Sequence, residues 1–252
     1  MTRIEARHDS DFLADTVGKA MSFPDRVLRG QDPFKNMSGP EMEVYVEKYF
    51  GGENWRDRLQ VNFNHSPMWR QMKRLFENGR RTNLFVRSTL GVISTAATSL
   101  LSKLTRRDYY NPFSHSVQVY HPEKAIVMKQ VAMAHEYDQS NVPTLRAIGT
   151  LGGILPAVGL NILSPSAIRD SWRASKVAIE HMPEVDKKQA RKILEREFVF
   201  DMIGGKWVAQ LALFPLALMH KFTRSGKTSI FFDSKKSIPP NLISPRPALA
   251  IA

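Results

Sequence analysis

The chain has 252 residues, of which 42% are hydrophobic, so it can form a packed core and wholesale disorder is excluded. It contains no cysteine, which excludes disulfides, Cys-based zinc fingers and iron–sulfur ligation by this chain. Its formal net charge of +12 favours an anionic partner, such as a lipid headgroup surface, nucleic acid or an acidic subunit.

Residues 1–65 predict an extended arm with short helices, of a kind that more often wraps a neighbouring chain than builds its own core. Phe23-Pro24 and Asp32-Pro33 break the chain early. Ser38 and Pro40 then suit the cap and the first turn of a helix, which Gly51-Gly52 ends. The alternative for this arm is an ordinary packed subdomain.

Residues 66–85 predict a basic helix with one apolar stripe. The stripe consists of Met68, Trp69, Met72, Leu75 and Phe76, and much of the remaining surface is occupied by Arg70, Lys73, Arg74, Arg80 and Arg81. Two interpretations stay open for it. It is either a helix on a membrane surface or a solvated basic face over an apolar core stripe.

Three apolar stretches follow, within a predicted domain that spans residues 66–222. Residues 86–104 are barely long enough to span a bilayer and predict a buried helix. Residues 147–163 carry no charge but four glycines and a proline, which predicts a membrane-embedded or re-entrant segment, or else packed core. The third stretch covers residues 207–219. Residues 223–252 are polar and rich in proline, and predict an extended tail that is ordered only against a partner.

The middle of the chain predicts a short β element before a long helix. Residues 108–114 predict a turn, and the alternating residues 117–120 predict a strand. A helix then opens at 121–124 and runs to His135, and further helices are expected over 167–181 and 184–202.

The sequence HEYDQ at residues 135–139 is one residue away from the H-E-x-x-H motif of zinc peptidases. In that motif, two histidines at i and i+4 hold zinc on one helical face, and the glutamate deprotonates a zinc-bound water. His135 and Glu136 are present, but Gln139 offers only a neutral amide, which is a poor zinc ligand.

Four short blocks extend this likeness: YNPFSHSVQVY at 110–120, HEYDQ at 135–139, DSWRAS at 170–175 and FDMIGG at 200–205. With them, the stretch from about Asp108 to Gly205 resembles a family of membrane-associated zincin-like proteins of bacteria and eukaryotic organelles. The resemblance implies a zincin-like helical core, with the metal ligands at His135, Gln139 and Asp170 and the catalytic base at Glu136. In zincins, the strand before the active-site helix often lies as an edge strand beside the substrate cleft.

Two of the implied ligands depart from the family pattern. Gln139 replaces the second histidine, and Asp170 replaces a glutamate and is one methylene shorter. Loss of a histidine ligand removes several kcal/mol from a zinc-binding free energy of about 10 kcal/mol. We therefore expect a vestigial site in which His135 hydrogen-bonds Asp170 and fixes helix packing, with no cofactor, or zinc if the site is retained. The other interpretations are a coincidental match to the motif and a different metal held by His115 or His121.

The sequence thus predicts a mainly α protein with a zincin-like core, a minor β element, apolar helical segments, an N-terminal arm and a C-terminal tail. The predicted function is that of a catalytically inactive accessory subunit of a membrane protein complex, in the mitochondrial inner membrane. Its predicted partners are other subunits of that complex and anionic lipid such as cardiolipin. One alternative is an active membrane-associated zinc metallopeptidase. The other is a basic, ribosome-associated nucleic-acid-binding protein, which the absence of a nucleic-acid-binding motif disfavours.

Overall fold

The computed structural model describes residues 4–8, 11–28, 39–77, 82–149 and 165–203. This part of the chain is mainly helical and contains a mixed four-stranded sheet with strand order β1-β2-β4-β3. β1 Ile4–His8, β2 Leu59–Phe63 and β4 Ser116–Val119 run parallel, and β3 Tyr109–Asn111 pairs antiparallel with β4. The prediction of a mainly helical protein with a minor β element is therefore confirmed.

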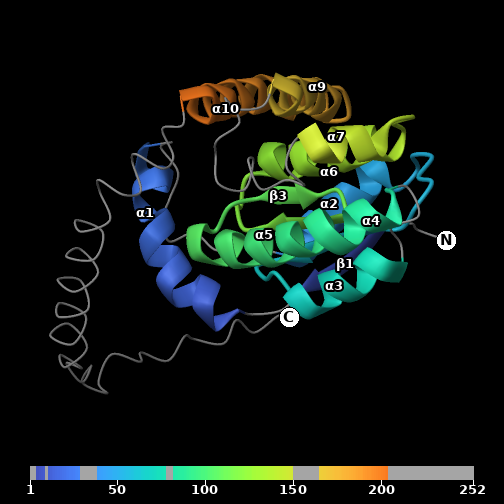
Figure 1. Cartoon of the computed structure of the whole chain (residues 1–252). Coiled ribbons are helices and arrows are strands. Elements are labelled where there is room, and N and C mark those ends of the chain that lie inside the picture. The colour runs from blue at the N-terminus through green and yellow to red at the C-terminus, as the bar shows by residue number, and fades with distance from the viewer. Residues whose placement is uncertain (1–3, 9–10, 29–38, 78–81, 150–164, 204–252) are drawn as a thin grey trace, which may run out of the picture.

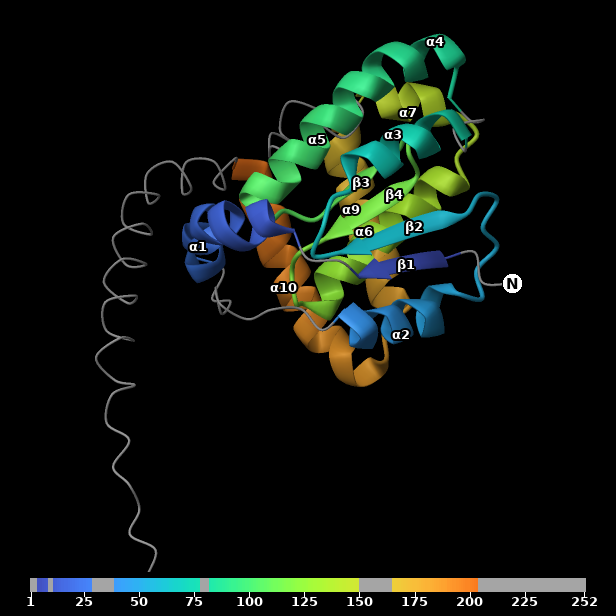
Figure 2. The same cartoon turned by 90° about the horizontal axis from the view of Figure 1, so that it is seen from below.

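Helices cover both faces of the sheet (Figures 1 and 2). In chain order they are η1 Ala14–Gly18, α1 Lys19–Leu28, α2 Gly39–Phe50, α3 Met68–Glu77, α4 Leu84–Val86, η2 Arg87–Gly91, α5 Val92–Thr105, α6 Lys124–Asp138, α7 Pro143–Gly149, α9 Pro165–Glu180 and α10 Glu184–Ile203. The η elements are π-helical turns within longer helices. α3 and α5 lie on one face of the sheet, α2 and α6 lie on the other, and α9 and α10 pack against α6.

The two faces of the sheet differ in polarity because side chains alternate along each strand. Val61, Phe63, Val117 and Val119 point into the main hydrophobic core, which they share with α2, α6 and α9. The opposite face carries Gln60, Asn62, Tyr109, Asn111, Ser116 and Gln118, all of them buried.

Part of this polar face is bonded to the helices that cover it. Gln71 of α3 accepts hydrogen bonds from the hydroxyls of Tyr109 and Ser116, both at 3.4 Å. The Asn111 amide donates to Thr95 Oγ1 of α5 at 3.1 Å. Buried polar groups are tolerated when they are paired in this way, so the layer between the sheet and α3 and α5 is hydrophilic.

The continuous helix Leu84–Thr105, formed by α4, η2 and α5, turns its polar side toward this layer. Its buried residues are Gly91, Ser94, Thr95, Thr98, Ser99, Ser102 and Thr105. Its large outward residues Leu84, Phe85, Ile93 and Leu100 are each at least 52% exposed. The helix predicted over 86–104 is thus confirmed, but its predicted burial is wrong, because small hydroxyl side chains and not the apolar ones match the polar sheet face.

The arm predicted over 1–65 is also different in the structure. Its described residues supply β1, β2 and α2, and Met42, Val46 and Trp55 are buried in the core. The helix predicted to start near Ser38 and end at Gly51 is confirmed as α2. The extended arm is wrong for this part of the chain, because β1 and β2 pair with each other across more than 50 residues, a distance at which local sequence patterns carry no signal.

The β element before α6 is confirmed with one correction. Residues 109–111, predicted as part of a turn, form the edge strand β3, and the predicted strand over 117–120 is β4 in the interior of the sheet. The expected helices are observed as α3, α6, α9 and α10. Residues 150–163 of the second apolar stretch, the third apolar stretch and the tail over 223–252 lie outside the described residues.

Candidate functional site

The residues of the HEYDQ sequence lie at the C-terminal end of α6. This helix is buried along most of its length because it lies between the apolar face of the sheet and α9. It ends at Asp138, and Gln139 follows as its cap residue. The site that the sequence predicts is therefore on a rigid element, and its neighbours decide its chemistry.

His135 faces the loop that follows α2. Its Nε2 atom lies 3.6 Å from Oε2 of Glu53, and its ring meets the Trp55 ring edge-on, with 5.1 Å between the ring centroids. The other Glu53 oxygen lies 3.0 Å from Nε2 of His181, just after α9. Glu53 thus bridges two imidazoles and links α6 to the end of α9.

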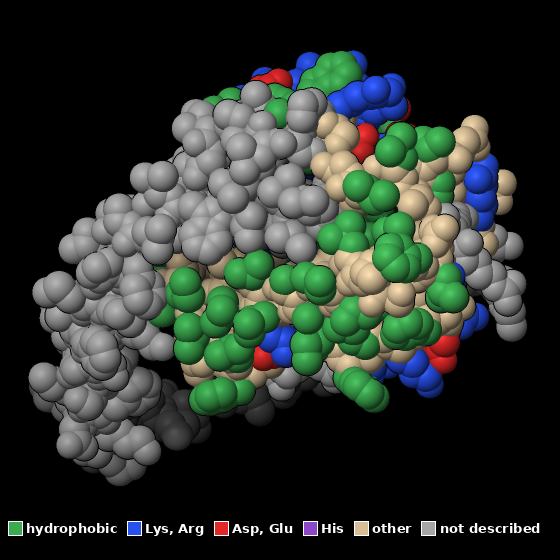
Figure 3. Space-filling view, viewed as in Figure 1, with side chains coloured by type: hydrophobic (Ala, Val, Ile, Leu, Met, Phe, Trp, Pro, Cys, Tyr) green, Lys and Arg blue, Asp and Glu red, His purple; other side chains and the backbone are tan. Residues whose placement is uncertain are grey.

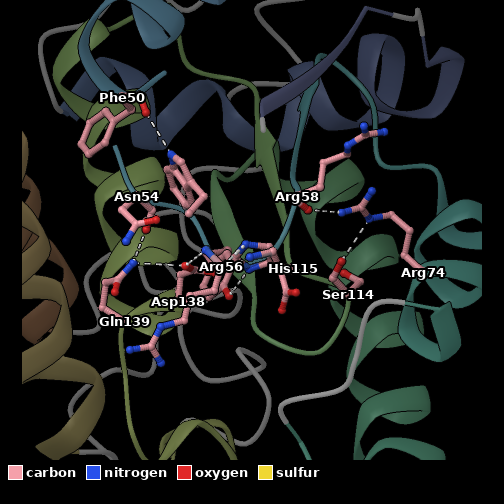
Figure 4. A network of polar contacts seen from close by, with 12 residues as sticks. Phe50, Asn54, Arg56, Arg58, Arg74, Ser114, His115, Asp138 and Gln139 are labelled. Atoms are coloured by element: carbon pink, nitrogen blue, oxygen red, sulfur yellow. Dashed lines mark hydrogen bonds and ion pairs between the residues drawn. The ribbon is translucent and has the colours of Figure 1, made fainter. Parts of the chain in front are cut away.

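Gln139 is engaged by the same loop. Its Nε2 donates to the Asn54 carbonyl oxygen at 2.5 Å and to Asp138 Oδ2 at 3.3 Å (Figure 4). The amide nitrogen is therefore fixed by the loop, and Oε1, the atom of this group that could bind a metal, is a neutral oxygen and a poor zinc ligand.

Asp138, which lies between His135 and Gln139 in the sequence, is fully buried and binds the backbone of the loop after α2. Its carboxylate accepts hydrogen bonds from the amides of Arg56 at 2.6 Å and Asp57 at 3.2 Å, and it lies 3.6 Å from His115 Nε2 (Figure 4). Residues 51–58, here called the 51–58 loop, are thus fixed across the end of α6. Carboxylates that accept several N–H groups make the stronger class of hydrogen bond.

The 51–58 loop is also anchored at its far end, by a buried arginine of α3. Arg74 donates to the Arg58 carbonyl oxygen at 2.6 Å and to the Ser114 carbonyl oxygen at 3.2 Å (Figure 4). One guanidinium therefore ties the loop to the turn between β3 and β4. The loop is a fixed part of the site.

Asp170, on α9, is paired with Arg146 of α7. The Arg146 guanidinium donates to both carboxylate oxygens, at 2.7 Å and 3.2 Å, and to the Glu136 carbonyl oxygen at 2.8 Å. It also lies over the Tyr137 ring, 4.6 Å from its centroid. Burial alone lowers the pKa of Arg146, but the bonds and charge of Asp170, with Tyr137 and Glu136, outweigh it and raise that pKa. Arg146 is a permanent cation between α6 and α9.

The predicted hydrogen bond between His135 and Asp170 is therefore wrong, because each has another partner: Glu53 for His135 and Arg146 for Asp170. Glu136 is half-buried and contributes its backbone carbonyl to Arg146. His115 contacts Tyr110 and Asp138, whereas His121 lies 3.2 Å from Asp108, so these two histidines have different partners.

The residues that the resemblance assigns to zinc do not fit that ion in this arrangement. Gln139 offers only a neutral amide oxygen while its amide nitrogen is bonded to the loop, and the Asp170 carboxylate accepts hydrogen bonds from a guanidinium on both oxygens. Within the described ranges, no group of three or more His, Cys, Asp or Glu side chains is placed to hold a metal ion.

Sequence reasoning missed Glu53, Arg146 and His181, which are the partners that define the site. Gly51-Gly52 marks the end of α2 in the sequence, but nothing local shows that the loop after it reaches α6. Arg146 follows the break at Asn141-Val142-Pro143, and its positive charge was the only feature in the sequence that could have indicated a carboxylate partner.

No protein-family model, curated protein or solved structure matches this chain. Function is therefore inferred from the contacts of these residues and from the surface of the protein.

Proposed function

We propose that this protein is a catalytically inactive accessory subunit of a membrane protein complex, with a zincin-like core whose metal site is replaced by contacts within the protein. One observation carries the proposal. The Arg146 guanidinium is bonded to both oxygens of Asp170 and to the carbonyl of Glu136, where the family pattern implies a metal between α6 and α9. A fixed organic cation thus replaces a divalent ion as the link between these helices.

This replacement opposes metal binding in addition to the change at Gln139. Zinc at Asp170 would have to break an ion pair whose side chains are only 16% and 7% exposed. The displaced guanidinium would then lie partly buried without a partner, which costs several kcal/mol. A histidine at position 139 therefore does not by itself restore the site.

Membrane association rests on a different part of the molecule. The helix Leu84–Thr105 is 22 residues long and apolar enough to cross a membrane, and the chain carries a net charge of +12. A basic protein with such a helix suits an anionic membrane, and the cardiolipin-containing mitochondrial inner membrane is the proposed location.

The test is the zinc content of the purified full-length protein after incubation with zinc and removal of the excess. The wild type, Gln139→His and Gln139→His/Arg146→Met are compared by elemental analysis. We expect no bound zinc in the wild type or in Gln139→His. One zinc per chain in the wild type would overturn the inactive-subunit proposal and favour the metallopeptidase. Zinc bound by the single variant Gln139→His, in which Arg146 is still present, would show that Arg146 does not block the site.

The subunit role needs a second experiment in the native membrane. After extraction with a mild detergent, the protein should migrate in native electrophoresis with a complex much larger than its own 28.7 kDa. Migration only as the free chain would contradict a role as a subunit.

A further inference from the structure

We propose that the outward side of the helix Leu84–Thr105, together with the adjoining part of α3, is the surface by which this protein lies on an anionic lipid bilayer. This surface, here called the apolar face, comprises Trp69, Phe76, Leu84, Phe85, Ile93 and Leu100. The inference rests on the membrane association proposed above, and adds which surface binds and how the protein is oriented.

The first support is the reversed polarity of the helix. A surface helix of a water-soluble protein turns its apolar stripe inward and its polar side outward. Here the serines and threonines of α5 are buried, while Ser88 and Thr89 of η2 are exposed together with Phe85 at 74% and Ile93 at 63%. Only 28% of the most apolar 18-residue stretch of this helix is buried in the protein. Transfer of these exposed apolar side chains from water to the acyl-chain layer of a bilayer is therefore favourable.

The second support concerns orientation. The hydroxyl side of the helix is bonded to the protein, with Thr95 accepting from Asn111 and the helix packed lengthwise against α3 and the sheet. A bilayer-spanning helix would have to leave this polar layer and expose its hydroxyls and those of the sheet to lipid. The helix therefore lies in the plane of the membrane and contributes one side, about 33 Å long.

The third support is the composition of the surroundings. Hydrophobic side chains gather over α3, α4 and α5 with few charged groups between them (Figure 3). Trp69 is 81% exposed, and tryptophan is enriched where proteins meet the lipid headgroup region. Arg70, exposed on the same helix, adds positive charge next to it, whereas exposed Lys73 is paired with Glu77 at 3.6 Å. Apolar side chains bordered by cations match the acyl layer and the phosphates of an anionic bilayer.

The apolar surface continues beyond these helices. The backbone N–H of Asn83, just before α4, donates to Thr144 Oγ1 at 3.3 Å and so places α7 beside the start of the helix. Leu145 of α7 is 68% exposed there. The apolar face itself is built from two separate segments, α3 and the helix Leu84–Thr105, which a single amphipathic peptide could not supply.

The experiment is co-sedimentation of the full-length protein with phosphatidylcholine vesicles, with and without cardiolipin. Phe85→Glu/Ile93→Glu places two charges at the level of the acyl chains, where they are costly. Val44→Glu/Val185→Glu is the matched control, since these valines are 68% and 90% exposed on α2 and α10, across the sheet from α5 (Figure 2). We expect the first variant to bind cardiolipin vesicles at least about tenfold more weakly than the wild type. The control should bind within about twofold of it.

Fluorescence reports the same contact. Vesicles should shift the tryptophan emission of the wild type to shorter wavelength, and Trp69→Phe should remove most of that shift. Equal vesicle binding by the wild type and Phe85→Glu/Ile93→Glu would overturn the assignment of this face and leave the proposed function standing. Absence of wild-type binding to either vesicle would overturn this proposal and the lipid contact, whereas the zinc and complex experiments would still decide the subunit role. If Phe85→Glu/Ile93→Glu binds vesicles as the wild type does but no longer migrates with the large complex in native electrophoresis, the face is a protein interface.

Discussion

Arg146 and Asp170 form a two-bond ion pair between α7 and α9, and the same guanidinium reaches the carbonyl of Glu136 on α6. Three helices therefore meet at one cation. The metal that the proposed zincin-like pattern implies would join only α6 and α9, through ligands that must be deprotonated and precisely spaced, whereas an arginine needs no supply of ions. The arrangement favours a stable scaffold over a reactive centre.

Arg146→Met should lower the free energy of unfolding by about 3 kcal/mol, because it leaves the Asp170 carboxylate buried without its partner. Arg146→Met/Asp170→Leu should recover most of this loss, since both charges are removed together. Urea unfolding of the four combinations measures the coupling. Lys187→Met, which breaks an exposed pair with Glu184, should change stability by about 0.5 kcal/mol or less and serves as control. Equal losses in the single and double variants would contradict the pairing.

Asp138→Ala should release the 51–58 loop. The substitution removes the acceptor for the amides of Arg56 and Asp57, and losing charged hydrogen bonds of this kind costs about 2–3 kcal/mol. Limited proteolysis should then cut within residues 51–58 faster than in the wild type. Glu195→Ala on the exposed side of α10 should leave the cleavage pattern unchanged. An uncut loop in Asp138→Ala would show that other contacts suffice to hold it.

Gly18→Ala should destabilise the contact between η1 and the end of α5. A Cβ atom at this position would lie 2.2 Å from the carbonyl oxygen of Lys103, which is backbone and cannot rotate away. Overpacking of this kind costs about 1–3 kcal/mol. Gly52→Ala is the matched control, because nothing lies within 4 Å of its added Cβ. Thermal unfolding should separate the two variants, and equal melting temperatures would refute the close approach of these helices.

Stability should decline in alkaline solution because of buried tyrosines. Burial raises the pKa of the Tyr109 hydroxyl, although hydrogen bonds from its neighbours oppose the shift. In the unfolded chain this group ionises near pH 10, while in the folded protein it stays protonated to higher pH. Its contribution is therefore fully present below about pH 10 and is lost as the pH rises further.

Tyr109→Phe tests this relationship. At neutral pH it should cost about 1 kcal/mol, through loss of the hydrogen bond to Gln71. Above about pH 10 its stability should fall less steeply than that of the wild type. Tyr45 and Tyr120, whose pKa values burial also raises, should preserve part of the decline. Urea unfolding between about pH 8 and about pH 11 gives the slopes, and identical slopes would contradict the prediction.

The sequence by itself determined the local helices and the position of a candidate motif. Cap residues, proline breaks and apolar periodicity were enough for α2, α3, α6, α9 and α10, because helices are built from contacts three and four residues apart. The likeness of residues 135–139 to a zinc-peptidase motif, with Gln139 at the position of its second histidine, was also readable, since the motif lies within five residues.

Tertiary structure alone decided the partners. Asp170 bonds Arg146 across 24 residues and Asp138 bonds Arg56 across 82, so no local pattern could show that a guanidinium and a loop hold these side chains. Tertiary structure also decided which side of the helix Leu84–Thr105 is buried against the sheet. Its composition is apolar overall, but the polar sheet face built from β2, β3 and β4 selects the serine and threonine side for burial. The physical reason is common to both: buried polar groups must find partners, and only the folded chain determines which distant residues supply them.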